Sequence, residues 1–455
     1  MKLLGRVLVF ISIIAGVLIA MVVGLGVFFL SQFFMAAKQG PNQLAAELRA
    51  LHSEGAPTTA AEMQRPLPPA ALNAALDYKQ FKALLRKKPL TPAEESEISV
   101  VGQFGRSTPA QNAALSRLLD RRSDVMTLVY RAARKPQCVF TRDWSQGIKL
   151  NLSDYKTMRE AATLLRARSY MLAEAGHYRE AISTDALAFR VADQVGREPI
   201  LISYLVDIVC DKIALSGMDE ILQLSGPNAA VADDVRTTIA NYRPSINLRR
   251  ATGGEVVMSI SAANYTRDQL PHAAQVRKQS GDVPSPALFA NWKTGRQNGY
   301  IDGMLAISLH YQRLLLETTS LPESQRRAAF NRVMAATTHL SDQYPKYLDR
   351  SSLAAILLPI MTQAADKQFE AYADERVVMA GAEALAYRAR HGVYPIRLDQ
   401  AAPNLPPDPF TQKPLLYCRE PGGFVVYSAG PTGHFDASKL GVKRGPREAY
   451  FRFPD

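Results

Sequence analysis

The chain has 455 residues, of which 47% are hydrophobic and 21% are charged, and its formal net charge is +12. These proportions are typical of a folded, mostly soluble protein, and they exclude a wholly disordered chain, a collagen-like fibre and a polytopic membrane protein. Three cysteines are too few for a disulfide scaffold and leave open one disulfide or simple burial. Basic residues are dispersed among acids, so we expect no nucleic acid partner.

The first forty residues predict a membrane anchor. No charged residue lies between Arg6 and Lys38, and this run of 31 residues is nearly all apolar. About 20 apolar residues cross the hydrocarbon core as a helix, so the run is long enough. A cleaved signal peptide and a buried soluble helix are the alternatives, but the signal's apolar region is usually about 7–15 residues. We therefore expect an uncleaved transmembrane helix within residues 1–40.

The charges beside this run favour one orientation. Lys2, Arg6 and the amino terminus precede it, whereas Lys38 alone follows closely, which favours a cytoplasmic amino terminus. The longest later apolar run, Leu353–Met361, is too short to span a bilayer and contains Pro359. We therefore expect a single span, with the main body outside the cytoplasm.

The body of the chain predicts helices. Residues 41–69 are expected to be a connector with a short helical piece at 43–52, and residues 70–390 an α-helical domain whose most regular part is 153–224. Residues 251–298 are less regular and predict a long loop or two short helices that could form a mobile flap. The helical ranges are 70–88, 109–134, 153–175, 178–195, 199–216, 228–250, 299–318, 323–340 and 350–391.

A short motif within the regular part is formed by Gly176, Tyr178 and Ala181. Its spacing resembles one tetratricopeptide repeat, in which a glycine turn, an aromatic residue and an alanine let two helices pack closely. Arg168 and Asp185 stand where that family prefers leucine and an aromatic residue, and there is no recurrence at 34 residues. The resemblance implies a helix hairpin, with an ordinary α-hairpin as the alternative.

The residue composition changes after residue 391. Recurrent prolines exclude a long helix there. Two short runs, 414–419 and 424–428, predict a β-hairpin with its turn at 420–423. A two-stranded hairpin is marginal alone, so we expect it to pack on the long helix that ends near Arg390.

The tail also carries an ordered series of short motifs. Its residues are Tyr394, Pro395, Asp408, Pro409, Phe410, Tyr417, Tyr427, Ser428 and Gly430. This order resembles the carboxyl-terminal module of the major pseudopilin of type II secretion systems, where a long helix leads to a Tyr-Pro corner, an Asp-Pro-aromatic turn and a Tyr-Ser-x-Gly strand end. It is also similar to the tail of uncharacterised, membrane-anchored helical proteins of bacteria. The resemblance implies a pseudopilin-like β module over residues 391–455.

Each motif has a physical reason. Asp408 can accept backbone N–H groups in an Asx-turn, while Pro409 fixes φ. Phe410 and Tyr417 can cover the hairpin. Gly430 can take a positive φ that other residues avoid.

Metal and cofactor motifs are weak. Pseudopilins follow the tail motif with acidic residues that hold calcium, whereas this chain offers Asp436 alone, and calcium needs six to eight oxygens. The seven histidines are scattered, and no phosphate-binding glycine loop precedes a helix. We therefore expect no metal and no cofactor.

Three fragments occur in the order used by penicillin-binding proteins and β-lactamases, namely Ser153-x-x-Lys156, Ser245-x-Asn247 and Lys293-Thr294-Gly295. That family needs a sheet around the last fragment, and no β-rich stretch is present to form one. We interpret Ser153 as a helix N-cap and predict no catalytic residue.

Two functions from different classes remain. The preferred hypothesis is a membrane-anchored protein of the bacterial inner membrane with a periplasmic body, a non-catalytic interaction or scaffold protein linked to a secretion or pilus-like assembly. Its partners would be envelope proteins. The alternative is an envelope hydrolase or lyase acting on cell-wall or lipid material. A pocket with two convergent polar side chains of shifted pKa would favour the enzyme.

Overall fold

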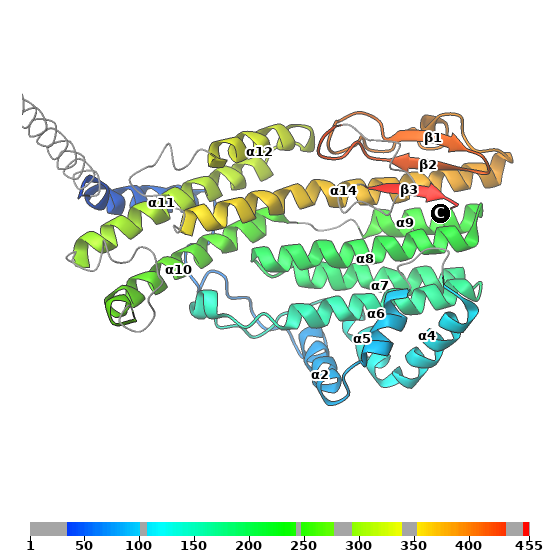
Figure 1. Ribbon diagram of the computed structural model, residues 1–455, viewed down its shortest axis with the longest axis horizontal. Coiled ribbons are helices and arrows are strands. Elements are labelled where there is room, and N and C mark those ends of the chain that lie inside the picture. The colour runs from blue at the N-terminus through cyan, green and yellow to red at the C-terminus, as the bar shows by residue number, and fades with distance from the viewer. Residues whose placement is uncertain are drawn as a thin grey trace, which may run out of the picture.

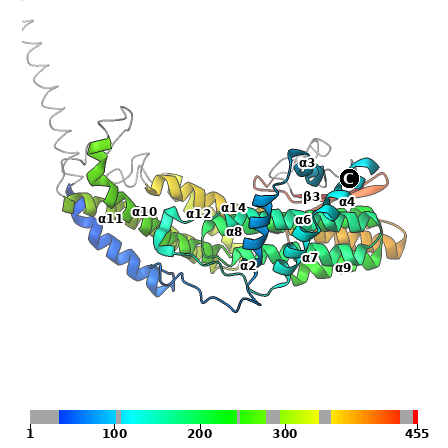
Figure 2. The same cartoon turned by 90° about the horizontal axis from the view of Figure 1, so that it is seen from below.

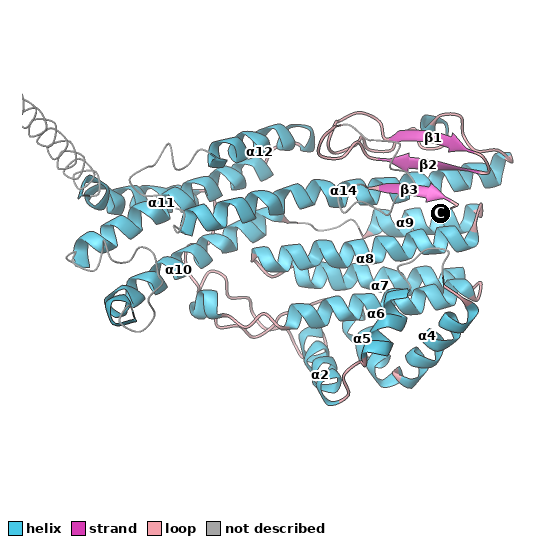
Figure 3. Cartoon of the chain, in the orientation of Figure 1, coloured by secondary structure: helices cyan, strands magenta, loops and turns pink. Residues whose placement is uncertain are grey.

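The computed structural model describes residues 34–100, 107–242, 247–276, 294–338, 353–433 and 449–454. Within these ranges the chain is mainly helical and ends in a small antiparallel sheet, which confirms the fold class at that level (Figure 3). Residues 1–33, which hold most of the expected transmembrane segment, lie outside them. None of the helices in the described ranges combines the length and apolar content that a membrane crossing needs.

The helices are named in chain order (Figure 1). After a helix at residues 34–53, the first group is α2 (Ala74–Lys87), α3 (Pro92–Val100), α4 (Pro109–Arg121), α5 (Ser123–Arg134), the 3-10 helix η1 (Trp144–Lys149), α6 (Asp154–Glu174), α7 (Tyr178–Gly196) and α8 (Leu201–Ser225). The second group is α9 (Ala229–Asn241), α10 (Leu248–Val276), α11 (Thr294–Thr319), α12 (Glu323–Thr338), α14 (Leu353–His391) and the 3-10 helix η3 (Leu398–Gln400).

The molecule is elongated, and several helices run along its long axis (Figure 1). The largest hydrophobic cluster lies among α2, α4 to α8, the second half of α14 and the sheet. Two smaller clusters join the helix at 34–53 to α10, α11, α12 and the first half of α14. Figure 2 shows the helix at 34–53, in blue, beside α10 and α11. The long helix α14 therefore connects the two ends of the body.

Three expectations about the amino-terminal half need correction. The single helix expected over 109–134 is divided at Arg122, which has φ −103° and ψ 27° and whose guanidinium donates to the carbonyl oxygens of Lys88 (3.0 Å) and Pro89 (3.1 Å). The helix expected at 43–52 in the connector is longer, since it already includes residue 34, the first described residue, and runs to residue 53. Ser153 precedes α6 but does not cap it, because its hydroxyl donates to Oδ1 of Asn151 at 2.6 Å.

Residues 251–298 were expected to form a long loop or two short helices. The loop alternative is wrong for the described part, because residues 251–276 continue α10 and residues 294–298 belong to α11, while residues 277–293 lie outside the described ranges. The loop was expected because Gly253 and Gly254 are poor helix formers. Both are buried in α10 and face the segments that it crosses, Gly253 at Pro57 and Gly254 at Pro199.

The region with the repeat-like motif forms a helix hairpin of α6 and α7, against which α8 packs. Gly176 has φ +78° at the turn, and Ala181 is fully buried. The hydroxyl of Ser169 donates to the carbonyl oxygen of Ala181 at 2.9 Å, and that of Tyr178 donates to the carbonyl oxygen of Leu224 at 3.2 Å. The motif residues therefore hold three helices together.

The sheet consists of β1 (Leu416–Glu420), β2 (Gly423–Tyr427) and β3 (Tyr450–Phe453), with β2 in the centre. The expected hairpin is present with a shorter turn, and β3 is a strand that the sequence did not predict. The sheet packs on α14 as expected. A Cβ on Gly381 of α14 would lie 2.5 Å from Cγ of Phe451, so the glycine makes room for this ring.

Candidate functional site

The tail motif is a compact set of hydrogen bonds around buried Asp408. Its Oδ1 accepts the backbone N–H groups of Phe410 (2.7 Å) and Thr411 (3.2 Å), so the expected Asx-turn is present. Its Oδ2 accepts the N–H of Ala429 at 2.7 Å, which ties the turn to the end of β2. Beside it, the N–H of Gly430, with φ +66°, donates to Oγ of Ser428 at 3.1 Å.

Two tyrosines of the tail motif pack on the ring of Phe424 in the sheet. The hydroxyl of Tyr417 donates to the carbonyl oxygen of Pro395 at 2.8 Å, and its ring lies 5.8 Å from that of Phe424 in the sheet. Tyr394 also contacts Phe424, at 5.2 Å between centroids. Tyr427 ends β2 and pairs with Leu416 on one side and Tyr450 on the other.

Phe410, which was expected to cover the hairpin, packs at the edge of the cluster that contains the sheet and also contacts two helices. Its ring lies 6.2 Å from that of Phe369 in α14, and the guanidinium of Arg327 in α12 lies 4.5 Å from its centroid. Pro409, which precedes Phe410, places it there by fixing the turn. The tail motif is therefore a structural clamp on α12 and α14.

Asp408→Ala should destabilise the protein by about 1–3 kcal/mol, because three backbone N–H groups lose their acceptor in a buried place. Urea unfolding of the purified protein measures this loss. Asp399→Ala, at a nearby carboxylate whose side chain is 56% exposed, is the control and should change stability little. Equal stability of the two variants would contradict the assigned role.

A second set of polar residues gathers where α7 ends. Glu198, which is 4% exposed, accepts from Nε of Arg142 at 2.7 Å and from the hydroxyl of Tyr155. Burial raises the pKa of Glu198, and the adjacent guanidinium of Arg142 opposes this shift. Arg142 also donates to the carbonyl oxygen of Asn151 at 2.9 Å. This ion pair fixes the connection between α7 and α8.

A pocket of about 360 Å³ lies along the last turns of α7. It is lined by Lys135, Pro136, Phe189, Arg190, Asp193, Gln194, Arg197, Asp211, Asn241 and Tyr242. Asp193 forms an ion pair with Arg197, and Nε of Arg190 donates to the hydroxyl of Tyr242 at 3.2 Å. Burial raises the pKa of Asp211, and the neighbouring carboxylates of Asp207, Glu375 and Asp193 raise it further. The pocket therefore combines cations with one buried carboxyl whose protonated form is favoured.

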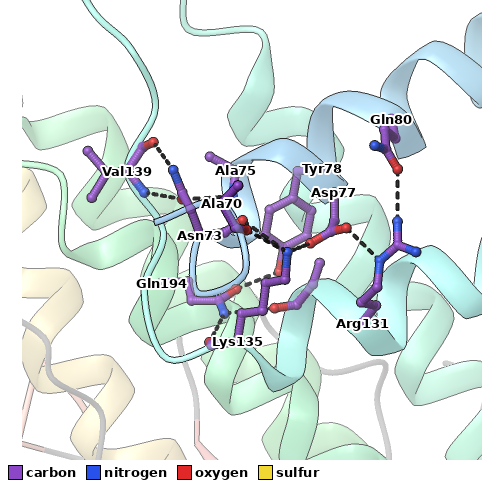
Figure 4. Close-up of polar contacts among 11 residues, drawn as sticks. Ala70, Asn73, Ala75, Asp77, Tyr78, Gln80, Arg131, Lys135, Val139 and Gln194 are labelled. Carbon is purple, nitrogen blue, oxygen red and sulfur yellow. Dashed lines mark hydrogen bonds and ion pairs between the residues drawn. The ribbon is translucent and has the colours of Figure 1, made fainter. Parts of the chain in front are cut away.

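Figure 4 shows how one wall of this pocket is held. Nε2 of Gln194 donates to the carbonyl oxygen of Lys135 at 2.8 Å, and its Oε1 accepts from the hydroxyl of Tyr78 at 2.7 Å. Nζ of Lys135 lies 2.6 Å from Oδ2 of Asp77. The amide of Asn73 bonds to both backbone groups of Val139. Helix α2 is thus fixed against α5 and α7, which keeps the wall in place.

Two aspartates pack against glycines across the α7–α8 interface. A Cβ on Gly217 of α8 would lie 2.5 Å from Cγ of Asp185 in α7. The reverse arrangement occurs where α7 ends and α8 begins. There a Cβ on Gly196 of α7 would lie 2.6 Å from Cγ of Asp207 in α8. Neither carboxyl has a hydrogen-bond partner among the described residues, and burial raises the pKa of both. Burial therefore favours the neutral form of both carboxyls.

Other groups considered from the sequence do not form a site. Oγ of Ser153 accepts from Nζ of Lys82 at 2.6 Å, whereas Lys156 is 75% exposed and lies near Glu160. Ser245, Lys293 and Asp436 lie outside the described residues. Of the remaining fragment residues, Asn247 accepts the backbone N–H of Arg250 through its Oδ1 at 2.9 Å, and Thr294 and Gly295 lie in the first turn of α11. All three cysteines are free, with Cys138 and Cys210 buried and Cys418 exposed. A larger pocket, of about 460 Å³, lies between η1 and α10, but its charged lining residues, Lys149 and Asp268, are exposed.

The residues around the end of α7 were missed by the sequence analysis. One signal was available, because Asp207 and Asp211 are spaced by four residues within the otherwise apolar first half of α8. Acids on the apolar face of a helix are costly unless they are paired or neutral. Arg65, Arg142 and Arg197 gave no such signal, because arginines are frequent and dispersed in this chain.

In comparisons with known proteins, no protein-family model, no curated protein and no solved structure matches this chain. The resemblances of the tail to pseudopilins and of the hairpin to a tetratricopeptide repeat therefore stay predictions.

Proposed function

We propose that the chain is a single-pass membrane-anchored envelope protein that acts as a non-catalytic scaffold. Its body would lie in the periplasm of a bacterium, and its partners would be envelope proteins of a secretion or pilus-like assembly. The observation that supports this proposal is the way in which the helix at 34–53, which follows the apolar run, is built into the body.

Close backbone contact joins this helix to α11. A Cβ on Gly40 would overlap the carbonyl oxygen of Gly299 and lie 2.7 Å from the backbone nitrogen of Gly303. A Cβ on Gly299 would lie 3.0 Å from the carbonyl carbon of Ala37. Small residues on both sides thus allow the helix backbones to touch.

Polar and apolar contacts extend this junction. The carboxylate of Glu47 accepts from Nε of Arg313 at 3.0 Å and lies 3.0 Å from Nδ1 of His310. Leu51 is fully buried in a cluster with residues of α10 and α11. A bilayer span within 1–33 would therefore continue into a helix that is fixed to the body. Such a junction sets the orientation of the body to the membrane, as a scaffold requires, whereas a flexible linker would not.

The proposal predicts where the chain is found and what it contacts. The full chain should stay in the membrane pellet after alkaline extraction, and a reporter fused after Asp455 should be active only when exported. Cross-linking in intact cells should capture envelope proteins. Gly40→Leu should reduce these cross-links, because leucine would separate the helix at 34–53 from α11, while Gln39→Leu at an exposed neighbouring position should not. A soluble chain, a reporter active in the cytoplasm or unchanged cross-links would contradict the proposal.

One observation favours the alternative of an envelope hydrolase or lyase. Asp211, 2% exposed, lines a pocket with Lys135, Arg190 and Arg197, and burial raises the pKa of its carboxyl. A carboxyl that keeps its proton in this way can act as a general acid towards an anionic substrate. Release of soluble product from cell-wall or phospholipid substrates by the purified chain, and its loss in Asp211→Asn, would support this function. Absence of release would reject it.

A further inference from the structure

A pocket of about 330 Å³ shares Arg197 with the pocket of about 360 Å³ described above. Its lining residues are Pro57, Glu62, Met63, Arg65, Arg197, Pro199 and Arg250. Three guanidinium groups reach it from three parts of the chain, since Arg65 follows the helix at 34–53, Arg197 follows α7 and Arg250 lies in the first turn of α10. We propose that Arg65, Arg197 and Arg250 form a binding site for a ligand that carries a phosphate group.

Backbone carbonyl groups hold the three side chains in place. Nη1 of Arg65 donates to the carbonyl oxygen of Arg197 at 3.3 Å, and Nη1 of Arg250 donates to that of Gly196 at 3.1 Å. Nη1 of Arg197 donates to the carbonyl oxygen of Pro136 at 2.9 Å. These partners orient the guanidinium groups without neutralising them. Each guanidinium has five N–H donors, so most donors of Arg65 and Arg250 remain for a ligand.

The acids nearby do not balance this charge. Asp193 pairs with Arg197 and Glu198 pairs with Arg142, while burial raises the pKa of Asp207 and so favours its uncharged form. Glu62 lines the pocket as a carboxylate that accepts the N–H groups of the preceding turn, from Thr58 at 2.6 Å and Thr59 at 3.0 Å. Together with Asp193 it offsets two of the three positive charges and leaves one for a ligand to balance.

The positive charges also act on one another. Burial lowers the pKa of Arg65, Glu198 opposes this shift, and Arg250 and Arg197 lower the pKa further. Like charges gathered in a half-buried pocket are unfavourable until an anion enters it. Guanidinium forks match the geometry of phosphate oxygens, which makes this anion the natural ligand. The volume suits a phosphate with a small organic group attached.

Titration calorimetry on the full-length protein tests the site with pyrophosphate, inorganic phosphate and a water-soluble short-chain phosphatidic acid as probes. We expect Arg65→Gln and Arg250→Gln each to weaken binding by at least about tenfold, since each removes a charge-assisted hydrogen bond. Arg249→Gln is the matched control. This neighbour in α10 also donates to backbone carbonyls, of Leu316 (3.2 Å) and Glu54 (2.8 Å), but does not line the pocket. The Arg249→Gln variant should bind the phosphate probes with the affinity of the parent.

The probes distinguish two sources of the phosphate group. Tighter binding of the phosphatidic acid than of inorganic phosphate and pyrophosphate would identify a lipid headgroup, and the reverse order would identify a soluble phosphate compound. No binding of any probe at millimolar concentration would overturn the proposal, as would equal losses in Arg249→Gln and Arg250→Gln. The inference does not depend on the scaffold function, because the site would bind phosphate in the purified protein whatever its address in the cell.

Discussion

Gly254→Ala should destabilise the protein by about 3 kcal/mol or more, one of the largest effects expected for a single methyl group. Helix α10 crosses the connection between α7 and α8 at this glycine. A Cβ there would overlap the carbonyl oxygen of Pro199 and lie 2.5 Å from its carbonyl carbon. Backbone atoms cannot rotate away as a side chain can, so the helix itself must move. Overpacking usually costs about 1–3 kcal/mol even where side chains can adjust.

The neighbouring residue provides a matched control. A Cβ on Gly253 would lie 3.2 Å from Cδ of Pro57, a close contact with the edge of a side-chain ring. Alanine also favours the helical state by about 1 kcal/mol relative to glycine. Gly253→Ala should therefore leave stability unchanged or raise it slightly. Urea unfolding followed by helical circular dichroism measures both variants, and equal midpoints would show that α10 does not contact Pro199 as described.

The same contact has a consequence for the arginine pocket. Pro199 and Arg250 both line it, and Arg250 lies one turn before Gly254 on α10. Moving α10 away from Pro199 would also move Arg250 away from Arg65 and Arg197. Gly254→Ala should therefore weaken phosphate binding as well as stability, whereas Gly253→Ala should preserve binding.

The tail could be predicted from the sequence because its geometry is local. The carboxyl of Asp408 reaches N–H groups two and three residues further on, and the positive φ of Gly430 follows from a turn that its neighbours define. The short strand Tyr450–Phe453 was missed, because four residues are too few for alternation to identify a strand. Its pairing with β2 is a long-range contact that spacing alone does not reveal.

Helix α10 was missed for a different reason. Two adjacent glycines lower helix propensity by about 1 kcal/mol each, so local rules favour a break. In the fold, Gly253 and Gly254 let α10 approach Pro57 and Pro199 closely, and the packing gained there outweighs the local cost. Tertiary contacts of this kind are invisible until both partners are placed.

The candidate sites could not be predicted from the sequence for a related reason. Arg65 and Arg197 are 132 residues apart, and Arg250 comes from a third segment, so no motif spacing links them. The buried acids could have been noticed more easily. Asp185 stood out as a departure from the repeat pattern, but its glycine partner, Gly217, lies on the next helix.

Asp185→Asn should remove a pH-dependent destabilisation of the protein. Burial raises the pKa of Asp185, the carboxylate of Glu220 raises it further, and Arg166 opposes the shift. The folded state therefore keeps a proton that the unfolded state releases near pH 4. Above that pH the contribution of Asp185 to stability falls by about 1.4 kcal/mol per pH unit, as long as the folded carboxyl stays neutral. Asparagine does not titrate, so its stability lacks this slope.

The slope separates this effect from other consequences of the substitution. An unpaired amide in place of the carboxyl would change stability by the same amount at every pH. The stability of Asp185→Asn minus that of the parent should therefore rise with pH above about pH 5, by up to about 1.4 kcal/mol per pH unit, as urea unfolding at several pH values measures. Asp120→Asn, at a carboxyl whose side chain is 70% exposed, is the control, and its stability should depend on pH as that of the parent does. If the stability of Asp185→Asn instead followed the same pH dependence as that of the parent, Asp185 would be charged in the fold. Its contact with Gly217 would then enclose an ionised group.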